Sequence, residues 1–357
     1  MSIVKLARPA IQAMQPYEAA IQVDNTVRLN ANESPQMSSA QHFRRPLNRY
    51  PEVRPLKLNQ SLAKRFGCEP SQLLVTRGSS EAIDLLVRTF CEAGKSSIVT
   101  PTPSFSMYWH YARIQGAAVI EVPTQANDNF KIDVDAILAA CTDTSRLIFV
   151  CSPNNPTGAS VSRSDIVRLL EGRENKSAVV VDEAYIEFSE YDSVIDLIGS
   201  YPNLVVLRTL SKALGFAGAR CGAVAGAEDV IRMLNAVQSP YALATPVIEC
   251  VEDALQDDQL TLADQVVTSL IQERKRVTDA VKAYNWVKNV WPSQANFFLI
   301  QVQDAESVMA HCAKNNILLR HFGGALADCI RISVGSVTDN NQLLAAFNTF
   351  GEKHDGR

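Results

Sequence analysis

Ionisable residues that could do chemistry follow two neighbouring apolar runs of this sequence. Asp182 ends the run Val179–Val181, and Lys212 follows the run Val205–Arg208. A carboxylate at the end of a buried run needs a cationic partner, and a protonated ring nitrogen is one such partner. A lysine taken alone is usually a solvated surface residue, but its position at the same sheet edge as Asp182, with Ser211 before it and Arg220 after it, favours a functional role.

Two further segments could bind an anion. Ser79 and Ser80 follow the run Leu73–Val75 and open a helix-length segment, where backbone N–H groups and the positive end of the helix dipole meet. Taken alone, such serines are more often ordinary helix caps. Ser211 and Arg220 could add a hydroxyl and a guanidinium, which together suit a phosphate group.

An amide, a phenol and an aromatic ring complete the set. Asn155 lies in a Pro/Gly-containing segment that could be only a turn, and Tyr108 could be only a core aromatic residue. Tyr185 follows Asp182 closely and could donate from its hydroxyl. An amine, an anion for a ring nitrogen, donors for a ring oxygen, an aromatic face and a phosphate site are the parts that pyridoxal phosphate requires. No single part is specific, but the ordered set is.

The elements that must position these side chains alternate from about residue 73 to residue 226. Short β-branched runs alternate with helix-length segments such as Ser80–Phe90 and Ser164–Leu170. This order predicts an α/β fold with a mostly parallel central sheet and helices on both faces. Ligands of such sheets bind at the carboxyl ends of the strands. The expected strands cover residues 73–75, 98–100, 118–122, 147–151, 179–182, 205–208 and 222–225.

The pattern changes after about residue 245 and indicates a smaller C-terminal α/β domain. We expect an irregular N-terminal arm at 1–30, a large domain at 31–260 and this small domain at 261–357. Its expected elements are a long helix over 261–288, a strand at 297–302, a helix near 305–315, a strand around 330–334 and a closing helix after 339.

Composition and motifs exclude several classes of protein. The 357 residues carry 34 Lys+Arg and 38 Asp+Glu without a long basic cluster, so we expect neither nucleic acid nor a membrane as partner. No apolar stretch approaches the ~20 residues of a bilayer span and no signal peptide is evident, so we expect a cytoplasmic protein. Cysteine and histidine spacings indicate no metal site. Dinucleotide, P-loop and nucleophile-elbow motifs are absent from the sequence.

The chain resembles the fold-type I pyridoxal-phosphate-dependent aminotransferases, and within them the histidinol-phosphate branch. The resemblance runs nearly end to end. At Ser80 the family often carries an acidic residue, but the resemblance implies a backbone contact there, so we expect little consequence. The motifs that carry the resemblance are residues 29–35, NRYP at 48–51, SPNNPTG at 152–158, VDEAYIEF at 181–188, LSKALGFAGARCG at 210–222 and IRISVG at 330–335.

The resemblance implies roles around the cofactor. Lys212 would be its covalent anchor and the general base that moves the substrate proton, and Asp182 would keep the ring nitrogen protonated. Asn155 and Tyr185 would donate to the ring hydroxyl oxygen, and Tyr108 would stack on the ring face. The phosphate cup would consist of Ser79, Ser80, Ser211 and Arg220.

The resemblance also implies substrate-binding residues and a homodimer with shared active sites. Arg331 would bind the carboxylate of glutamate and, in the other half-reaction, the phosphate of histidinol phosphate, with help from Arg320 and Tyr17. A surface charge at Arg320 and a packing tyrosine at Tyr17 are equal alternatives. Tyr50 would reach the phosphate of the neighbouring subunit's cofactor, and Tyr241 would lie near the partner's pocket.

The implied reaction transfers an amino group between L-histidinol phosphate and 2-oxoglutarate, giving imidazole-acetol phosphate and L-glutamate, in L-histidine biosynthesis. An aromatic amino-acid aminotransferase and a threonine-phosphate-type decarboxylase are alternatives on the same scaffold. They differ in the substrate pocket. A non-catalytic regulator would need an added DNA-binding segment, for which the chain leaves no room, and Lys212 argues against it.

Overall fold

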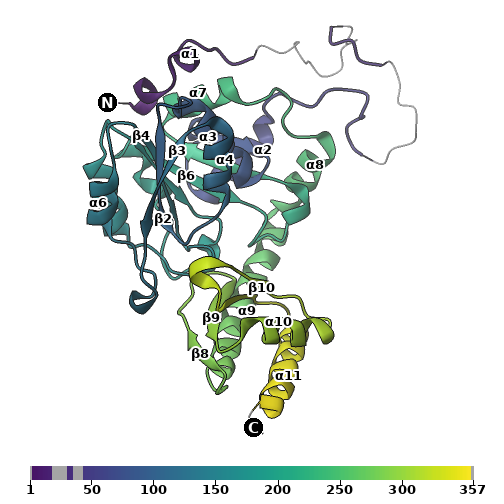
Figure 1. Ribbon diagram of the computed structural model, residues 1–357. Coiled ribbons are helices and arrows are strands. Elements are labelled where there is room, and N and C mark those ends of the chain that lie inside the picture. Colours follow the sequence, from purple (N-terminus) through teal and green to yellow (C-terminus); the bar gives the residue numbers. More distant parts are fainter. Residues whose placement is uncertain (1, 18–29, 35–42, 355–357) are drawn as a thin grey trace.

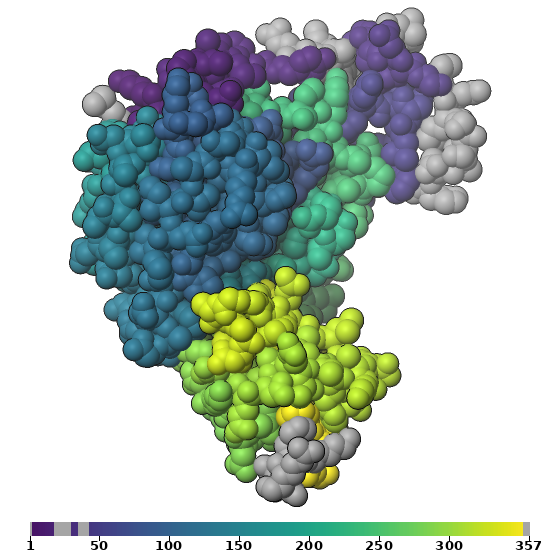
Figure 2. All heavy atoms as spheres, viewed as in Figure 1, coloured from purple at the N-terminus to yellow at the C-terminus, as the bar shows by residue number. Residues whose placement is uncertain are grey.

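The computed structural model describes residues 2–17, 30–34 and 43–354 of the chain. Figure 1 shows a large sheet with helices on both faces and, below it, a smaller sheet with the C-terminal helices. In Figure 2 the two parts pack directly against each other, and the surface narrows where they meet. In the described residues, no helix is long and apolar enough to cross a membrane.

The bounds of the elements are as follows. The large sheet contains β1 (Leu73–Thr76), β2 (Ser97–Thr102), β3 (Ala118–Pro123), β4 (Ser145–Cys151), β5 (Ala178–Asp182), β6 (Leu204–Thr209) and β7 (Gly222–Gly226). The small sheet contains β8 (Val287–Val290), β9 (Phe297–Val302), β10 (Arg320–His321) and β11 (Cys329–Ser333). The α-helices are α1 (Pro9–Gln12), α2 (Leu56–Phe66), α3 (Gly78–Phe90), α4 (Met107–Gln115), α5 (Val134–Ala140), α6 (Arg163–Gly172), α7 (Glu228–Val237), α8 (Thr245–Ala254), α9 (Asp257–Val281), α10 (Ala305–Lys314) and α11 (Val337–His354). Short 3-10 helices are η1 (Ile3–Leu6), η2 (Pro70–Gln72), η3 (Ala126–Asp128), η4 (Ile186–Phe188), η5 (Ile195–Gly199), η6 (Ala217–Ala219) and η7 (Gly324–Leu326).

The large sheet has the predicted, mostly parallel arrangement. Its strand order is β1-β7-β6-β5-β4-β2-β3, and β7 runs antiparallel to both of its neighbours. The neighbours from β6 to β3 all pair in parallel. Strands buried on both faces are apolar throughout rather than alternating, which is why short β-branched runs marked them in the sequence. The carboxyl ends of β1, β2, β4, β5 and β6 therefore lie at one edge.

Alternate residues of each strand enter two separate cores. Val179 and Val181 pack with residues of α2, α5, α6 and α8 on one face of the sheet. Val180 packs with residues of α3, α4 and α7 on the other face. Because side chains alternate along a strand, Asp182 faces the same side as Val180. This periodicity directs the Asp182 carboxylate toward α4.

The small sheet is antiparallel, in the order β10-β11-β9-β8, and its core contains Phe298, Ile300 and Phe347. Helix α9 ends at Val281, several residues before the predicted end at 288, because residues 287–290 pair with β9 as a strand.

The domain boundary expected after residue 260 lies within α9, which belongs to both parts of the molecule. Val267 packs with Phe188 of the large part, whereas Val277 and Val281 join the core of the small sheet. Arg274 donates from its guanidinium to the backbone oxygens of Phe188 and Ala295.

The start of the chain differs from the irregular arm that the sequence predicted. Ile3 is fully buried in the same core as α3 and α7. The backbone N–H of Arg8 donates to Thr89, and its guanidinium donates to the backbone oxygen of Arg88. Residues 3–12 are therefore docked on the end of α3. Residues 18–29 of the expected arm lie outside the described part, as do both ends of the motif at 29–35.

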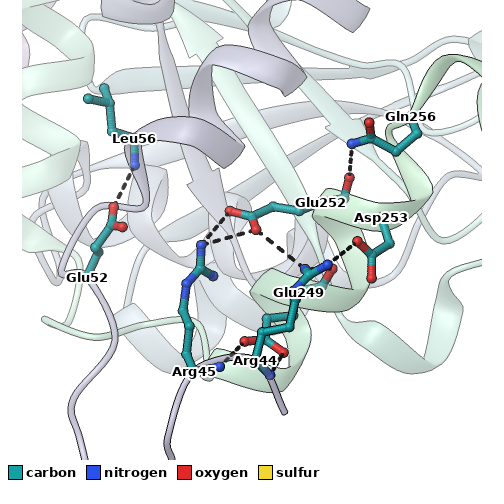
Figure 3. A network of polar contacts seen from close by, with 8 residues as sticks. All are labelled: Arg44, Arg45, Glu52, Leu56, Glu249, Glu252, Asp253 and Gln256. Carbon is teal, nitrogen blue, oxygen red and sulfur yellow. Dashed lines mark hydrogen bonds and ion pairs between the residues drawn. The ribbon is translucent and has the colours of Figure 1, made fainter. Parts of the chain in front are cut away.

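Ion pairs attach the segment before Tyr50 to α8 (Figure 3). The backbone N–H groups of Arg44 and Arg45 both donate to the carboxylate of Glu249. The guanidinium of Arg45 donates to both carboxylate oxygens of Glu252, at 3.1 Å each. Both glutamates are buried, so these contacts satisfy carboxylates that would otherwise be costly to bury. The segment thereby acquires a fixed position beside the large sheet.

Candidate active site

A cavity of about 680 Å³ lies at the edge formed by the carboxyl ends of the parallel strands, and β10 and β11 close its other side. This is the position where open α/β sheets bind ligands. The cavity brings together most of the residues predicted from the sequence. These are Ser79, Ser80, Asn155, Asp182, Tyr185, Ser211, Lys212, Arg220, Arg320 and Arg331.

Asp182 lies at the floor of this cavity and is 2% exposed. Its Oδ2 accepts a hydrogen bond of 2.8 Å from the hydroxyl of Tyr108, and its Oδ1 accepts one of 3.2 Å from the backbone N–H of Ala184. Burial outweighs these two hydrogen bonds and the charge of Lys212, which favour the ionised form, and raises the pKa of the Asp182 carboxyl to about 6. In the described chain, no cationic side chain is bonded to this carboxylate. The site therefore suits a ligand that carries a positive charge at this point.

Lys212 follows β6 and is half-buried in the same cavity. Its amine makes no hydrogen bond or ion pair with the described residues and lies 5.5 Å from the centre of the Tyr185 ring. Burial lowers the pKa of this amine, and the positive charges of Arg331 and Arg220 lower it further. A lowered pKa leaves more of the amine neutral, which is the form that attacks a carbonyl carbon.

Asn155 connects the two sides of the cavity. Its Nδ2 donates to the Tyr185 hydroxyl at 3.3 Å, and its Oδ1 accepts a hydrogen bond from the guanidinium of Arg331. Burial raises the pKa of the Tyr185 hydroxyl, so this group remains protonated and can donate. The loop after β4 and strand β11 thus meet through one amide side chain.

One end of the cavity is built for an anion. Ser79 and Ser80 lie in the first turn of α3, where backbone N–H groups are free to bind a ligand. The guanidinium of Arg220 donates to the Ser211 hydroxyl at 3.3 Å. Gly78 has a φ of +75°, and a Cβ atom there would lie 3.0 Å from Nη2 of Arg220. The absence of a side chain at Gly78 therefore lets this guanidinium approach the start of the helix.

Two arginines line the opposite side. Arg320 and Arg331 are paired residues of β10 and β11, and both face the cavity. Their guanidinium carbons lie 5.7 and 5.9 Å from the centre of the Phe322 ring, respectively. Nε of Arg331 is buried without a hydrogen-bond partner, and no carboxylate of the described residues pairs with either arginine. Two neighbouring guanidiniums, neither of which has a carboxylate partner in the described residues, predict a second anion-binding site.

Tyr108 does not line the cavity, in contrast to the position beside the cofactor ring that the sequence predicted. Its ring is fully buried against Phe149, with 4.6 Å between ring centroids, and it does not line the cavity. Phe105, three residues earlier, lines the cavity instead. Tyr108 lies within α4, on its buried face, whereas Phe105 lies in the loop directly after β2. The spacing from the strand end was the signal that could have distinguished them.

The sequence also overlooked several other residues of the lining. Cys151 pairs in register with Asp182 across β4 and β5, so both side chains reach the same cavity. Ser104 lines the cavity from the loop after β2 and donates to Asn154. Phe322 follows β10 and packs beside the two arginines.

Three predicted tyrosines lie away from this cavity. Tyr50 is 49% exposed and stacks on Tyr241, with 4.6 Å between ring centroids. Tyr17 is 55% exposed. None of the three lines the cavity of its own chain. The structure of a single chain therefore does not bring them to the other predicted residues.

Comparison with known proteins identifies the family. Residues 19–347 match the family of class I and II aminotransferases. The chain belongs to this family.

Within this family, the chain is similar to histidinol-phosphate aminotransferases. A histidinol-phosphate aminotransferase of Aeromonas salmonicida is 40% identical over 97% of this chain and 98% of its own length. Another, of Xylella fastidiosa, is 40% identical over 96% of this chain and 96% of its own length. The solved histidinol-phosphate aminotransferase of Sinorhizobium meliloti, in complex with pyridoxal-5'-phosphate, has a TM-score of 0.78 at 24% identity. That alignment covers 86% of this chain and 84% of that one. The predicted fold class and the resemblance to the histidinol-phosphate branch are confirmed.

The approach of Arg220 to Gly78 leads to a test of the anion end of the cavity. We expect Gly78→Ala to weaken binding of pyridoxal phosphate by up to about tenfold, because the end of the Arg220 side chain must shift from its place beside the start of α3. Gly67→Ala is the matched control, since Gly67 has a φ of +80° with nothing within 4 Å of the added Cβ. Each variant should lose roughly 1–2 kcal/mol of unfolding free energy from the left-handed backbone. Equilibrium dialysis and urea unfolding measure the two effects, and equal affinities in the two variants would contradict this role of Gly78.

Proposed function

We propose that this protein is a pyridoxal-phosphate-dependent transaminase that interconverts L-histidinol phosphate and 2-oxoglutarate with imidazole-acetol phosphate and L-glutamate, in L-histidine biosynthesis. The observation that carries the proposal is the shared cavity of Lys212 and the buried Asp182, with an anion site at each side. The full-length similarity to histidinol-phosphate aminotransferases supports the choice of substrate.

The residues present fit pyridoxal phosphate. Asp182 is a buried carboxylate that is bonded to no cationic side chain of the described residues. A protonated ring nitrogen would supply the positive partner that a buried carboxylate requires. Arg220 and the first turn of α3 would hold the phosphate, and Phe105 would cover one ring face. When bound, the cofactor supplies an electron sink for the pair of electrons left on the substrate carbon.

Two residues would manage the protons of the reaction. Lys212, as covalent anchor, would take the proton from the substrate carbon at its Nζ. It would then deliver this proton to the cofactor carbon. Its lowered pKa makes the neutral amine available for this task. Tyr185 would donate from its hydroxyl to the ring oxygen, and Asn155 would hold that hydroxyl in place.

The arginines would bind the acidic ends of both substrates in turn. Arg331 would take the carboxylate of glutamate, and Arg320 would join it on the phosphate of histidinol phosphate. A phosphate dianion can accept from two guanidiniums at once, whereas a single carboxylate is satisfied by one. This arrangement would let one pocket serve both half-reactions.

A homodimer with shared sites belongs to the proposal. Tyr50 is exposed and stacks on the partly buried Tyr241 outside their own cavity, and the segment before Tyr50 is fixed to α8. An exposed aromatic ring that is held in place by a neighbouring ring suits a role in the site of a second subunit. We assign Tyr50 to the cofactor phosphate of that subunit, and Tyr241 and Tyr17 to its substrate side. The eight unpaired cysteines are in keeping with the cytoplasm as the location of this dimer.

The first prediction of the proposal concerns the reaction itself. We expect glutamate to transfer its amino group to imidazole-acetol phosphate with a much higher kcat/KM than to phenylpyruvate, in a ping-pong assay. Lys212→Ala should lose the visible absorption of the covalently held cofactor and about 10²–10⁴-fold or more of kcat, since anchor and base are removed together. Preference for phenylpyruvate would favour an aromatic aminotransferase, and loss of carbon dioxide from threonine phosphate a decarboxylase.

A second prediction separates the two arginines. Arg320→Ala should lower kcat/KM for histidinol phosphate by about 10–100-fold, the effect of one charge-assisted hydrogen bond, with a much smaller effect on glutamate. Arg331→Ala should lower kcat/KM for both substrates. The measurement is kcat/KM for each substrate in the parent and in both variants. A parallel loss for the two substrates in Arg320→Ala would remove Arg320 from the phosphate site.

A third prediction tests the shared sites. Lys212→Ala and a Tyr50→Ala variant should each be weakly active, and mixed dimers should regain part of the parent activity. Complementation arises because one of the two sites in a mixed dimer then carries neither change. Activity is measured after subunit exchange, with each variant mixed with itself as the control. If the mixture is no more active than the two variants kept apart, Tyr50 does not serve a second subunit.

A further inference from the structure

Tyr108 contacts the site from behind, outside the cavity. Its hydroxyl donates to Oδ2 of Asp182 at 2.8 Å, and its side chain is fully buried. The ring lies nearly parallel to Phe149, at an interplanar angle of 11°, so the hydroxyl has little freedom to turn away. Oδ1 of Asp182 accepts from the backbone N–H of Ala184. The carboxylate is therefore held at both oxygens by the protein alone.

We propose that Tyr108 is a positioning residue for the transamination reaction, which holds the Asp182 carboxylate ionised and in a fixed orientation toward the cofactor ring. This inference rests on the proposed function for its catalytic consequence. The hydrogen bond itself is independent of it. An ionised carboxylate has about four acceptor positions, so the bonds from Tyr108 and Ala184 leave room for a ring N–H.

A tyrosine suits this position because its hydroxyl, while protonated, can only donate toward an ionised carboxylate. Burial keeps the pKa of the Tyr108 hydroxyl well above its ordinary value, so the hydroxyl stays protonated. A hydrogen bond to the charged form of a carboxyl group favours ionisation and opposes the effect of burial. Without this donor, the buried Asp182 would take up a proton at a higher pH and could no longer hold a positive charge on the ring.

The other titratable groups around Asp182 do not supply the same effect. Cys151, on β4, has a buried thiol whose pKa is raised, so it remains neutral. Tyr185 is likewise kept protonated by burial. Lys212 contributes a favourable charge but makes no hydrogen bond to the carboxylate, and it is engaged with the substrate during the reaction. Tyr108 is the group from α4 that touches Asp182 directly.

The test compares Tyr108→Phe with the parent and with Tyr111→Phe, which removes a hydroxyl from the same helix away from the cavity. In the full chain freed of pyridoxal phosphate, the carboxyl carbon of Asp182 is titrated by ¹³C NMR and assigned with Asp182→Asn. We expect the midpoint to rise by about 1–2 pH units in Tyr108→Phe, the equivalent of one hydrogen bond to a charged group, and to stay unchanged in Tyr111→Phe. In the loaded enzyme, kcat should fall at least tenfold with little change in KM.

The outcomes separate the inference from the proposed function. An unchanged titration of Asp182 in Tyr108→Phe overturns the inference, whatever happens to activity. A raised midpoint with kcat equal to the parent's also overturns it, because the ionisation of Asp182 then does not depend on Tyr108 in the loaded enzyme. A loss of thermal stability alone, with the titration and kcat retained, assigns Tyr108 a structural role and rejects positioning. Failure of the parent to transaminate is a separate result that rejects the proposed function.

Discussion

The burial of one carboxylate, Asp182, is the constraint on which the rest of the site depends. A carboxylate at the end of a strand that is covered on both faces loses most of its hydration, and only hydrogen bonds and nearby positive charge can offset that loss. The strand supplies the position, α4 supplies the donor Tyr108, and the turn after the strand supplies the N–H of Ala184. Each of these elements would be unremarkable alone. Together they hold a carboxylate at a point where the described part of the chain offers no bonded cation.

Residues of both sheets line the cavity. The large sheet contributes the groups that must not move relative to one another, because its parallel strands end at one edge and are locked by two cores. The small antiparallel sheet contributes Arg320 and Arg331, which under the proposed function would bind the acidic ends of the substrates. In that function, the reacting groups and the groups that choose the substrate would lie on separate elements. A family can change the second without disturbing the first, which fits the variety of substrates that one scaffold serves.

The strands and most of the cavity could be predicted from the sequence because both depend on local patterns. Parallel strands buried on both faces are continuous apolar runs, and site residues follow such runs directly. The features that could not be predicted from the sequence depend on three-dimensional packing. Tyr108 and Phe105 lie three residues apart, and only the direction of α4 decides which of the two reaches the cavity. The strand at 287–290 was hidden because its residues are half-exposed, and its partner β9 lies several residues further along.

Helix α9 gives the molecule a mechanical property that neither sheet has alone. A helix of 25 residues is roughly 37 Å long, and its two ends belong to different cores. Arg274, in the second half of this helix, donates to the backbone oxygens of Phe188 and Ala295. A flexible loop would allow the two parts to separate freely, whereas a continuous helix transmits bending and torsion. The two arginines and Lys212 stand on different parts of the molecule, so a helix that lines none of the cavity still takes part in setting the distance across it.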